Sequence, residues 1–415
     1  MGQRWSRLGT AISALALVAL TAGGAAGAAT ARHASLAPIK IGFVNTLSGP
    51  FAEVGQDALA GANLAVAQIN AKGGVLGGHP LKLVVKDEQA DPTVTATDVK
   101  SLLGQGVKLI AGFMDDSDCL AALPLIQSAG GVMVGMSCQS DLMTTAKYSP
   151  SFFEIPPNNT ELGRASAVFA AQHFPNLTWS YIGPNYEYGH EVWQLFQTTL
   201  SGLNKGSKFG KAEFPSLTET AFTPYVTSIL STLPANSAQN SGLYTSEFGS
   251  STIDLVKQSA PYKFFSRFKA VINVGGSTPT AVALGASTPR LYFVYDYDNL
   301  AYHNAVNTAF VNAYTAQHHI APDAWAYEGY TAVLALENGI QRAHSAAPAA
   351  VDRAMSGMTF QSPKGAVTFR RQDHLLMSPV TVWEVVGDAH AKGGFRIVFA
   401  QAVPASEVAP APKPR

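Results

Sequence analysis

From Ile39 onward the chain alternates short apolar runs with amphipathic segments, and this alternation constrains the fold more than any other feature of the sequence. The apolar run Ile39–Val44 is typical of a parallel strand that is buried on both faces. In the next segment, 55–70, apolar side chains recur at steps of three and four residues, which predicts a helix. Asp91-Pro92 predicts the start of a second helix, with Asp as N-cap and Pro in the first turn.

The alternation continues in two successive series. The first is predicted to contain strands at 81–86, 107–113 and 132–136 and a helix at 120–127. The second is predicted to contain helices at 161–173, 191–203, 223–233 and 253–259 and strands at 178–182, 211–214, 242–244 and 270–274. Two such βαβ series predict an α/β protein with two parallel-sheet lobes and helices on both faces.

The last part of the chain is expected to be less regular. It is predicted to contain a strand at 291–295, a long helix at 325–343 and further strands at 367–370, 380–386 and 395–399. The Pro- and Ala-rich segment 404–415 predicts a disordered tail.

The first 28 residues are predicted to be a secretory signal peptide. Arg4 and Arg7 give a positive start, the apolar run 11–20 is shorter than the roughly 20 residues of a membrane span, and Ala26-Gly27-Ala28 is an A-x-A cleavage site. An N-terminal anchor helix is the alternative. Because no Cys follows the apolar run, we expect an exported protein, periplasmic or extracellular, without a lipid anchor.

Charge and cysteine content narrow the possible partners. The 28 basic and 28 acidic residues balance, so we expect no nucleic-acid partner and favour a small-molecule ligand. Cys119 and Cys138, the two cysteines, lie at predicted neighbouring strand and helix ends and are expected to form a disulfide in an oxidising compartment. Two buried thiols are the alternative. The histidines show no H-E-x-x-H pattern, and we expect neither a metal nor a cofactor.

Small or polar residues follow several predicted strands, where ligands of open α/β sheets bind. These exits are 45–50, 115–117, 137–141 and 183–189, with 245–249 as a possible fifth. Each alone is compatible with an ordinary turn. Their recurrence at successive strand ends predicts a binding site.

The N-terminal block carries a family resemblance. Ile39-Lys40-Ile41-Gly42 leads into Thr46-Leu47-Ser48-Gly49-Pro50, and Ala60-Gly61-Ala62, Ile69–Val75 and Asp91-Pro92 follow in order. Tyr188-Gly189, 327–343, 361–365 and 380–386 extend the match in register. Over roughly 38–400 the chain resembles the leucine/isoleucine/valine-binding proteins, the type I periplasmic solute receptors of ABC importers.

The resemblance implies two Rossmann-like lobes, joined by three crossing strands, that close on a ligand. The crossings are expected near 152–156, 294–296 and 376–380. Lobe one would comprise 38–153 and 296–376, and lobe two 155–294 and 378–402. The resemblance also implies a membrane ABC permease as partner, and we expect a monomer.

The resemblance places the ligand-binding residues as well. A hydroxyl position for the ligand carboxylate falls on Asp116, between Asp115 and Ser117, and the next exit supplies Ser137, Cys138 and Gln139. Family aromatic residues correspond to Tyr188 and Phe248, whereas Phe51 and Val54 lie in the first loop, where Val54 replaces a usual Tyr. The acidic residue that would hold a ligand ammonium corresponds to Gly275.

Two of these positions depart from the family pattern. Asp116 beside a ligand carboxylate would cost energy through like-charge repulsion, and Gly275 leaves an ammonium without its partner. An ordinary branched-chain amino acid is therefore doubtful as the ligand. A one-residue slip would return Ser117 to the hydroxyl position, and helix capping is the alternative role of Asp115 and Asp116. Tyr188 and Phe248 are either a wall for the ligand or lobe core.

Three functions remain open at this stage. The first is the receptor of a transporter, which captures a small polar solute such as an amino acid, amide or amine. A free-standing sensor that works with a signalling receptor is the second. An exported enzyme is disfavoured because the sequence lacks a G-x-S-x-G elbow and a G-x-x-x-x-G-K-[ST] loop; 135–139 only begins like an elbow.

Overall fold

The computed structural model describes residues 36–49 and 51–412, and its first main sheet has five strands in the order β2-β1-β3-β4-β5. All neighbouring strands in it are parallel. The strands are β1 (Ile39–Asn45), β2 (Leu81–Asp87), β3 (Leu109–Gly112), β4 (Val132–Gly135) and β5 (Phe152–Glu154). The helices of this lobe are α1 (Ala52–Ala71), α2 (Pro92–Gly104), α3 (Asp116–Ser128), α4 (Asp141–Thr144), α11 (Ala305–His318), α12 (Ala324–Ala343) and α13 (Pro348–Met355). The predicted signal peptide lies outside the described residues.

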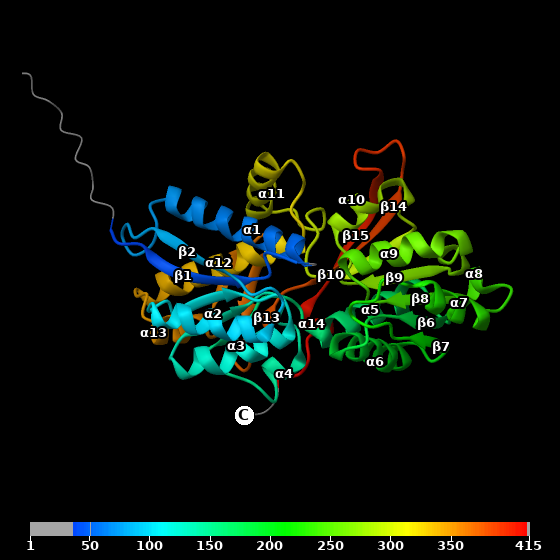
Figure 1. Cartoon of the computed structure of the whole chain (residues 1–415), viewed down its shortest axis with the longest axis horizontal. Helices are drawn as coiled ribbons and strands as arrows, with labels where there is room; N and C mark the ends of the chain where they lie inside the picture. Colours follow the sequence, from blue (N-terminus) through cyan, green and yellow to red (C-terminus); the bar gives the residue numbers. More distant parts are fainter. Residues whose placement is uncertain (1–35, 50, 413–415) are drawn as a thin grey trace, which may run out of the picture. The chain divides into compact units, whose positions relative to one another are not determined.

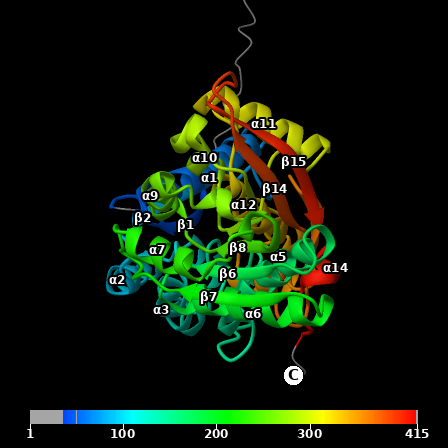
Figure 2. The same ribbon diagram turned by 90° about the vertical axis from the view of Figure 1, so that its right-hand side faces the viewer.

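The second main sheet has seven strands in the order β15-β14-β10-β9-β8-β6-β7. Its strands are β6 (Thr178–Ile182), β7 (Lys208–Glu213), β8 (Ser241–Thr245), β9 (Ala270–Val274), β10 (Leu291–Tyr295), β14 (Val380–Gly387) and β15 (Phe395–Val403). Its helices are α5 (Asn159–His173), α6 (Glu187–Leu203), α7 (Thr223–Thr232), α8 (Ser237–Asn240), α9 (Gly249–Ser259) and α10 (Thr278–Leu284). β14 and β15 pair antiparallel at one edge and are the long red strands of Figure 2.

The two sheets confirm the predicted α/β fold with two parallel-sheet lobes, whose elements form separate groups in Figure 1. Asp91 is the N-cap of α2, and its carboxylate accepts a hydrogen bond of 2.7 Å from the backbone N–H of Thr93. The predicted helix at 120–127 begins earlier, at Asp116, because Asp115 caps it. Helices α10, α11 and α13 have no counterpart among the elements that the sequence pattern predicted.

Two glycines allow α12 to pack against α1 across a long stretch of sequence. A Cβ atom at Gly61 would lie 1.9 Å from the carbonyl oxygen of Ala326, and a Cβ at Gly329 would lie 1.9 Å from that of Ala58. Neither position therefore tolerates a side chain without moving the backbone. Gly61 belongs to the Ala60-Gly61-Ala62 motif that carried the family resemblance. Close packing of α1 against α12 therefore accounts for the glycine in this motif.

The chain passes between the two lobes after β5, after β10 and after β13 (Leu376–Met377). β13 belongs to a small sheet with β11 (Thr359–Ser362) and β12 (Gly365–Phe369). Lys364, in the turn between β11 and β12, has a fully buried side chain and forms an ion pair with Asp296. Its ammonium group also donates to Ser378 Oγ at 3.2 Å and to the carbonyl of Pro379 at 2.6 Å. Lys364 thus joins two of the three connections.

The segment after Pro404 differs from the predicted disordered tail as far as the structure describes it. Residues Ala405–Val408 form the short helix α14, and Val408 is buried. Arg164 donates hydrogen bonds to the carbonyl groups of Val408 and Ala409, and Arg370 donates to that of Pro410. The composition is that of a tail, but these two arginines and one apolar contact hold it against the lobes.

Candidate ligand-binding site

One cavity of about 200 Å³ lies where strand exits of both main sheets meet. Its walls combine carboxylates, small polar groups and aromatic rings. The lining residues are Phe51, Met114, Asp115, Asp116, Ser117, Leu120, Ser137, Gln139, Tyr186, Glu187, Tyr188, Leu217, Phe248, Gly275, Tyr295 and Trp325. Within residues 36–49 and 51–412 no cluster of His, Cys, Asp and Glu is arranged to hold a metal ion.

The first polar group of the cavity comes from the start of α3. Asp115 is the N-cap, and its Oδ1 accepts hydrogen bonds from the backbone N–H groups of Ser117 at 2.7 Å and Asp118 at 3.0 Å. It also accepts from Ser117 Oγ at 2.5 Å. The capping role considered for this pair of aspartates is therefore confirmed for Asp115.

Asp116 makes different contacts from its neighbour. Its Oδ1 reaches the exit of β4 and accepts hydrogen bonds from the backbone N–H groups of Gln139 and Ser140, each at 2.7 Å. Burial raises the pKa of Asp116 to about 7, although these two hydrogen bonds act to lower it. The carboxylate consequently joins the ends of two neighbouring strands and changes its charge near neutral pH.

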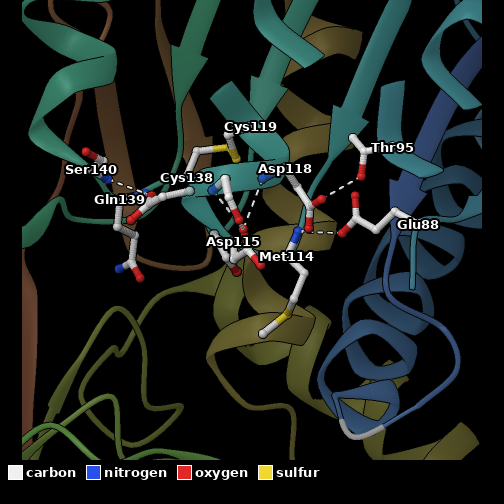
Figure 3. The surroundings of a disulfide bond; sticks show 12 residues. Glu88, Thr95, Met114, Asp115, Asp118, Cys119, Cys138, Gln139 and Ser140 are labelled. Atoms are coloured by element: carbon white, nitrogen blue, oxygen red, sulfur yellow. Dashed lines mark hydrogen bonds between the residues drawn. A yellow bond between two sulfur atoms is a disulfide. The ribbon is translucent and has the colours of Figure 1, made fainter. Parts of the chain in front are cut away.

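A disulfide lies behind this wall. Cys119 in α3 and Cys138 after β4 are bonded, with their Cα atoms 5.8 Å apart. The structure thus agrees with the predicted pairing. Figure 3 shows the bond next to Asp115 and Gln139. Cys138 is buried and does not line the cavity, in contrast to its predicted ligand-binding role, because its sulfur points to Cys119.

Buried carboxylates also support the wall from behind. Glu88 accepts a hydrogen bond of 2.7 Å from the backbone N–H of Met114, and Thr95 Oγ1 donates to Asp118 Oδ1 at 2.6 Å. Burial raises the pKa of Asp118 to about 7 and that of Glu88 well above its usual range. Figure 3 shows both contacts beside α3.

Lobe two supplies an aromatic wall. Tyr188 is 6% exposed, and its hydroxyl donates to the carbonyl of Val274 at 3.1 Å. The ring of Phe248 lies edge-on to it, with ring centroids 6.2 Å apart. Gly275 has a φ of +83°, and a Cβ there would lie 2.9 Å from the Tyr188 hydroxyl. A side chain at this position would be strained by the positive φ and would press against the Tyr188 hydroxyl.

An aromatic pair spans the cavity. Phe51 is the N-cap of α1 in lobe one, and Phe248 is the N-cap of α9 in lobe two. Their rings are stacked with centroids 6.0 Å apart. Val54, which we placed in the same loop, is instead buried in the core and does not line the cavity.

All predicted ligand-binding residues except Cys138 line this one cavity. Sequence reasoning missed several others, which are Met114, Leu120, Tyr186, Glu187, Leu217, Tyr295 and Trp325. Tyr186 and Glu187 lie within a predicted strand exit, and Tyr295 lies at a predicted crossing between the lobes. Their positions in the predicted topology could therefore have identified them as lining residues. Trp325 and Leu217 come from elements with no such signal.

Comparisons with known proteins agree with this architecture. The family model described as periplasmic binding protein matches residues 38–393. A leucine-, isoleucine-, valine-, threonine- and alanine-binding protein of Pseudomonas aeruginosa is 26% identical over 85% of this chain and 91% of its own length. A Leu/Ile/Val/Thr-binding protein of Salmonella typhimurium is 23% identical over 81% of this chain and 88% of its own length. These relatives are named as binding proteins, not as enzymes.

Solved structures share the fold. A branched-chain amino acid transporter substrate-binding protein of Streptococcus pneumoniae, in complex with isoleucine, has a TM-score of 0.76 at 20% identity, covering 88% of this chain and 99% of its own. A solute-binding protein of an ABC transporter of Rhodopseudomonas palustris, in complex with 3,4-dihydroxybenzoic acid, has a TM-score of 0.77 at 19% identity, covering 89% and 98%. Because the family model matches most of this chain, the chain belongs to the periplasmic binding protein family.

Proposed function

We propose that this protein captures a small polar solute, an amino acid or a related amide or amine, between its two lobes and delivers it to an ABC permease in the membrane. The observation that carries the proposal is the shared cavity: Asp116 and Ser137 reach it from lobe one, and Tyr188 and Phe248 from lobe two. The names of the relatives support a solute of amino-acid size.

Capture by hinge closure involves no covalent reaction. A ligand that contacts both lobes binds the closed arrangement better than the open one and shifts the population towards it. The Phe51–Phe248 pair supports this mechanism, because each ring belongs to a different lobe. We place lobe one at 38–153 and 296–376 and lobe two at 155–294 and 378–402, and we expect the exported protein to act as a monomer. No helix within the described residues is long and apolar enough to cross a membrane.

A two-stage experiment tests this function. A thermal-shift screen of amino acids, amides, amines and aromatic acids should identify a ligand, and at 100 times its dissociation constant it should stabilise the protein by about 2.7 kcal/mol. Small-angle scattering at saturation should then show a smaller radius of gyration. A non-binding analogue of the ligand at the same concentration is the control. An unchanged radius with the bound ligand would contradict hinge capture, and a screen without any ligand would contradict solute binding.

A further inference from the structure

The polar side chains of the cavity mainly offer hydrogen-bond acceptors. Three of their donors are already used inside the protein: Ser137 Oγ donates to Glu328 at 3.4 Å, Gln139 Nε2 to the carbonyl of Pro157 at 2.9 Å, and the Tyr295 hydroxyl to Gln139 Oε1 at 3.4 Å. The charged residues that line the cavity are Asp115, Asp116 and Glu187, and no described Lys, Arg or His lines it. The cavity is therefore an acidic environment.

The positions that would suit a bound anion already hold carboxylates of the protein. Asp116 Oδ1 takes the backbone N–H groups of Gln139 and Ser140. The N-caps of α6 and α9 make no side-chain capping bond, and the free N–H groups at such helix starts attract negative charge. Glu187, in the first turn of α6, supplies that charge for one helix.

Glu247 lies at the start of the other helix, but burial raises its pKa to about 8, so its carboxyl group is mostly uncharged at neutral pH. It directly precedes the N-cap of α9, is buried, and accepts a hydrogen bond from Ser251. Helices α3 and α6 thus each begin at the cavity with acidic residues that line it, Asp115 and Asp116 for α3 and Glu187 for α6. A ligand carboxylate would meet like charge at the starts of both of these helices.

The apolar part of the cavity suits a cation as well. Six aromatic side chains line it, two from lobe one and four from the second sheet and its loops: Phe51, Trp325, Tyr186, Tyr188, Phe248 and Tyr295. Aromatic faces attract organic cations, and the attraction grows when the pair is removed from water. Trp325 and Tyr295 are only 5% and 4% exposed, so a cation beside them would be largely desolvated.

We infer that the solute is an organic ammonium ion with an apolar body and without a carboxylate group, and that Asp116 is its counter-ion. No described residue donates a hydrogen bond to Asp116 Oδ2, which leaves this oxygen for the ligand. The inference rests on the proposed function and narrows its solute class. It goes beyond the names of the relatives, which describe amino-acid-binding proteins.

Calorimetric titration with two probes of matched shape tests the charge preference. Phenethylammonium carries the cation, and 3-phenylpropionate carries an anion on a similar body. The titrations are done at pH 8, above the pKa of about 7 of Asp116, so that this carboxylate is mostly ionised. We expect phenethylammonium to bind and 3-phenylpropionate to bind at least tenfold more weakly.

Two variants assign the preference to Asp116. Asp116→Asn keeps an oxygen for the N–H groups of Gln139 and Ser140 but removes the charge, and it should weaken phenethylammonium binding at least tenfold. Asp388→Asn removes a carboxylate of the β14–β15 hairpin that pairs with Arg396, and it should leave the affinity unchanged. Circular dichroism of both variants checks that they are folded.

The other outcomes separate this inference from the function on which it rests. Tighter binding of 3-phenylpropionate, or of isoleucine, than of phenethylammonium would overturn the cation assignment and leave the solute receptor intact. An Asp116→Asn variant that binds phenethylammonium as well as wild type would overturn the role of Asp116. Binding of neither probe would overturn the assignment too, whereas failure of the whole ligand screen is needed to overturn the proposed function.

Discussion

The two walls of the cavity are built by different forces. On the lobe-one side, Asp115 and Asp116 are fixed by hydrogen bonds to backbone N–H groups, and a disulfide lies directly behind them. On the lobe-two side, Tyr188 and Phe248 are positioned mostly by ring packing, and no cysteine is left there to form a covalent link. The first wall is therefore a polar surface held by hydrogen bonds, whereas the second is an aromatic surface held by side-chain packing.

The largest effect on stability is expected for Lys364, which joins two of the chain connections between the lobes. Lys364→Met removes the cation of the buried Lys364–Asp296 pair and leaves Asp296 without its partner. Removing one member of a buried ion pair costs about 3–5 kcal/mol. Urea denaturation of both proteins measures the difference in free energy of unfolding.

The pH dependence of that variant provides a second test. Burial raises the pKa of Asp296, and Lys364 acts to lower it. Without Lys364 the pKa of Asp296 in the folded state rises further above its value in the unfolded state. The variant should therefore lose stability as the pH increases from the unfolded-state pKa of Asp296 to its folded-state pKa. The double variant Lys364→Met with Asp296→Asn should recover part of the loss. A single variant as stable as wild type at pH 8 would show that the pair does not hold the connection.

Loss of the disulfide should have the next largest effect. The bond closes a loop with a sequence separation of 19, for which the chain-entropy model gives about 3 kcal/mol. The double variant Cys119→Ala with Cys138→Ala should be destabilised by this amount in urea denaturation. Wild type treated with reductant should match it. Equal stability of the oxidised wild type and the double variant would mean that hydrogen bonds alone hold this wall.

A smaller effect is expected for the cap of α3. Asp115→Ala removes the acceptor of the Ser117 and Asp118 N–H groups and should cost about 1 kcal/mol. Asp115→Asn should cap nearly as well and is the matched control. The difference in urea midpoint between the two variants measures the effect. If the Ala variant is no less stable than the Asn variant, the capping role of Asp115 is wrong.

Most of the fold could be predicted because buried parallel strands have a simple pattern. Runs such as 178–182 and 270–274 are short, rich in apolar, aromatic and β-branched residues, and followed by glycine, and the structure forms β6 and β9 with these bounds. The disordered tail was predicted from composition alone. This prediction differs from the structure because two arginines that are distant in sequence, Arg164 and Arg370, donate hydrogen bonds to carbonyl groups of the segment. Local sequence cannot reveal such contacts.

The candidate site was predicted where it depends on strand exits and missed where it depends on packing. Asp116 and Tyr188 lie in the first turns of the helices that follow β3 and β6, so topology places them at the cavity. Trp325 reaches the cavity from the first turn of α12, and no local pattern indicates its direction. The same limit applies to Cys138, whose side chain is in the disulfide and not in the cavity lining, because a position at a strand exit does not say which side of the wall a side chain faces.

The central claim is that one ligand is held by both walls, and paired substitutions test it most directly. Phe51→Ala truncates the lobe-one ring of the pair that spans the cavity, and Phe248→Ala truncates the lobe-two ring. Calorimetric titration with the ligand found in the screen should show each variant to bind about tenfold more weakly or worse, because aromatic anchors supply much of the binding energy. Tyr262→Ala, an exposed residue outside the cavity, is the control. If one of the two phenylalanine variants binds as tightly as wild type while the other loses binding, the ligand is held by a single lobe and the account is wrong.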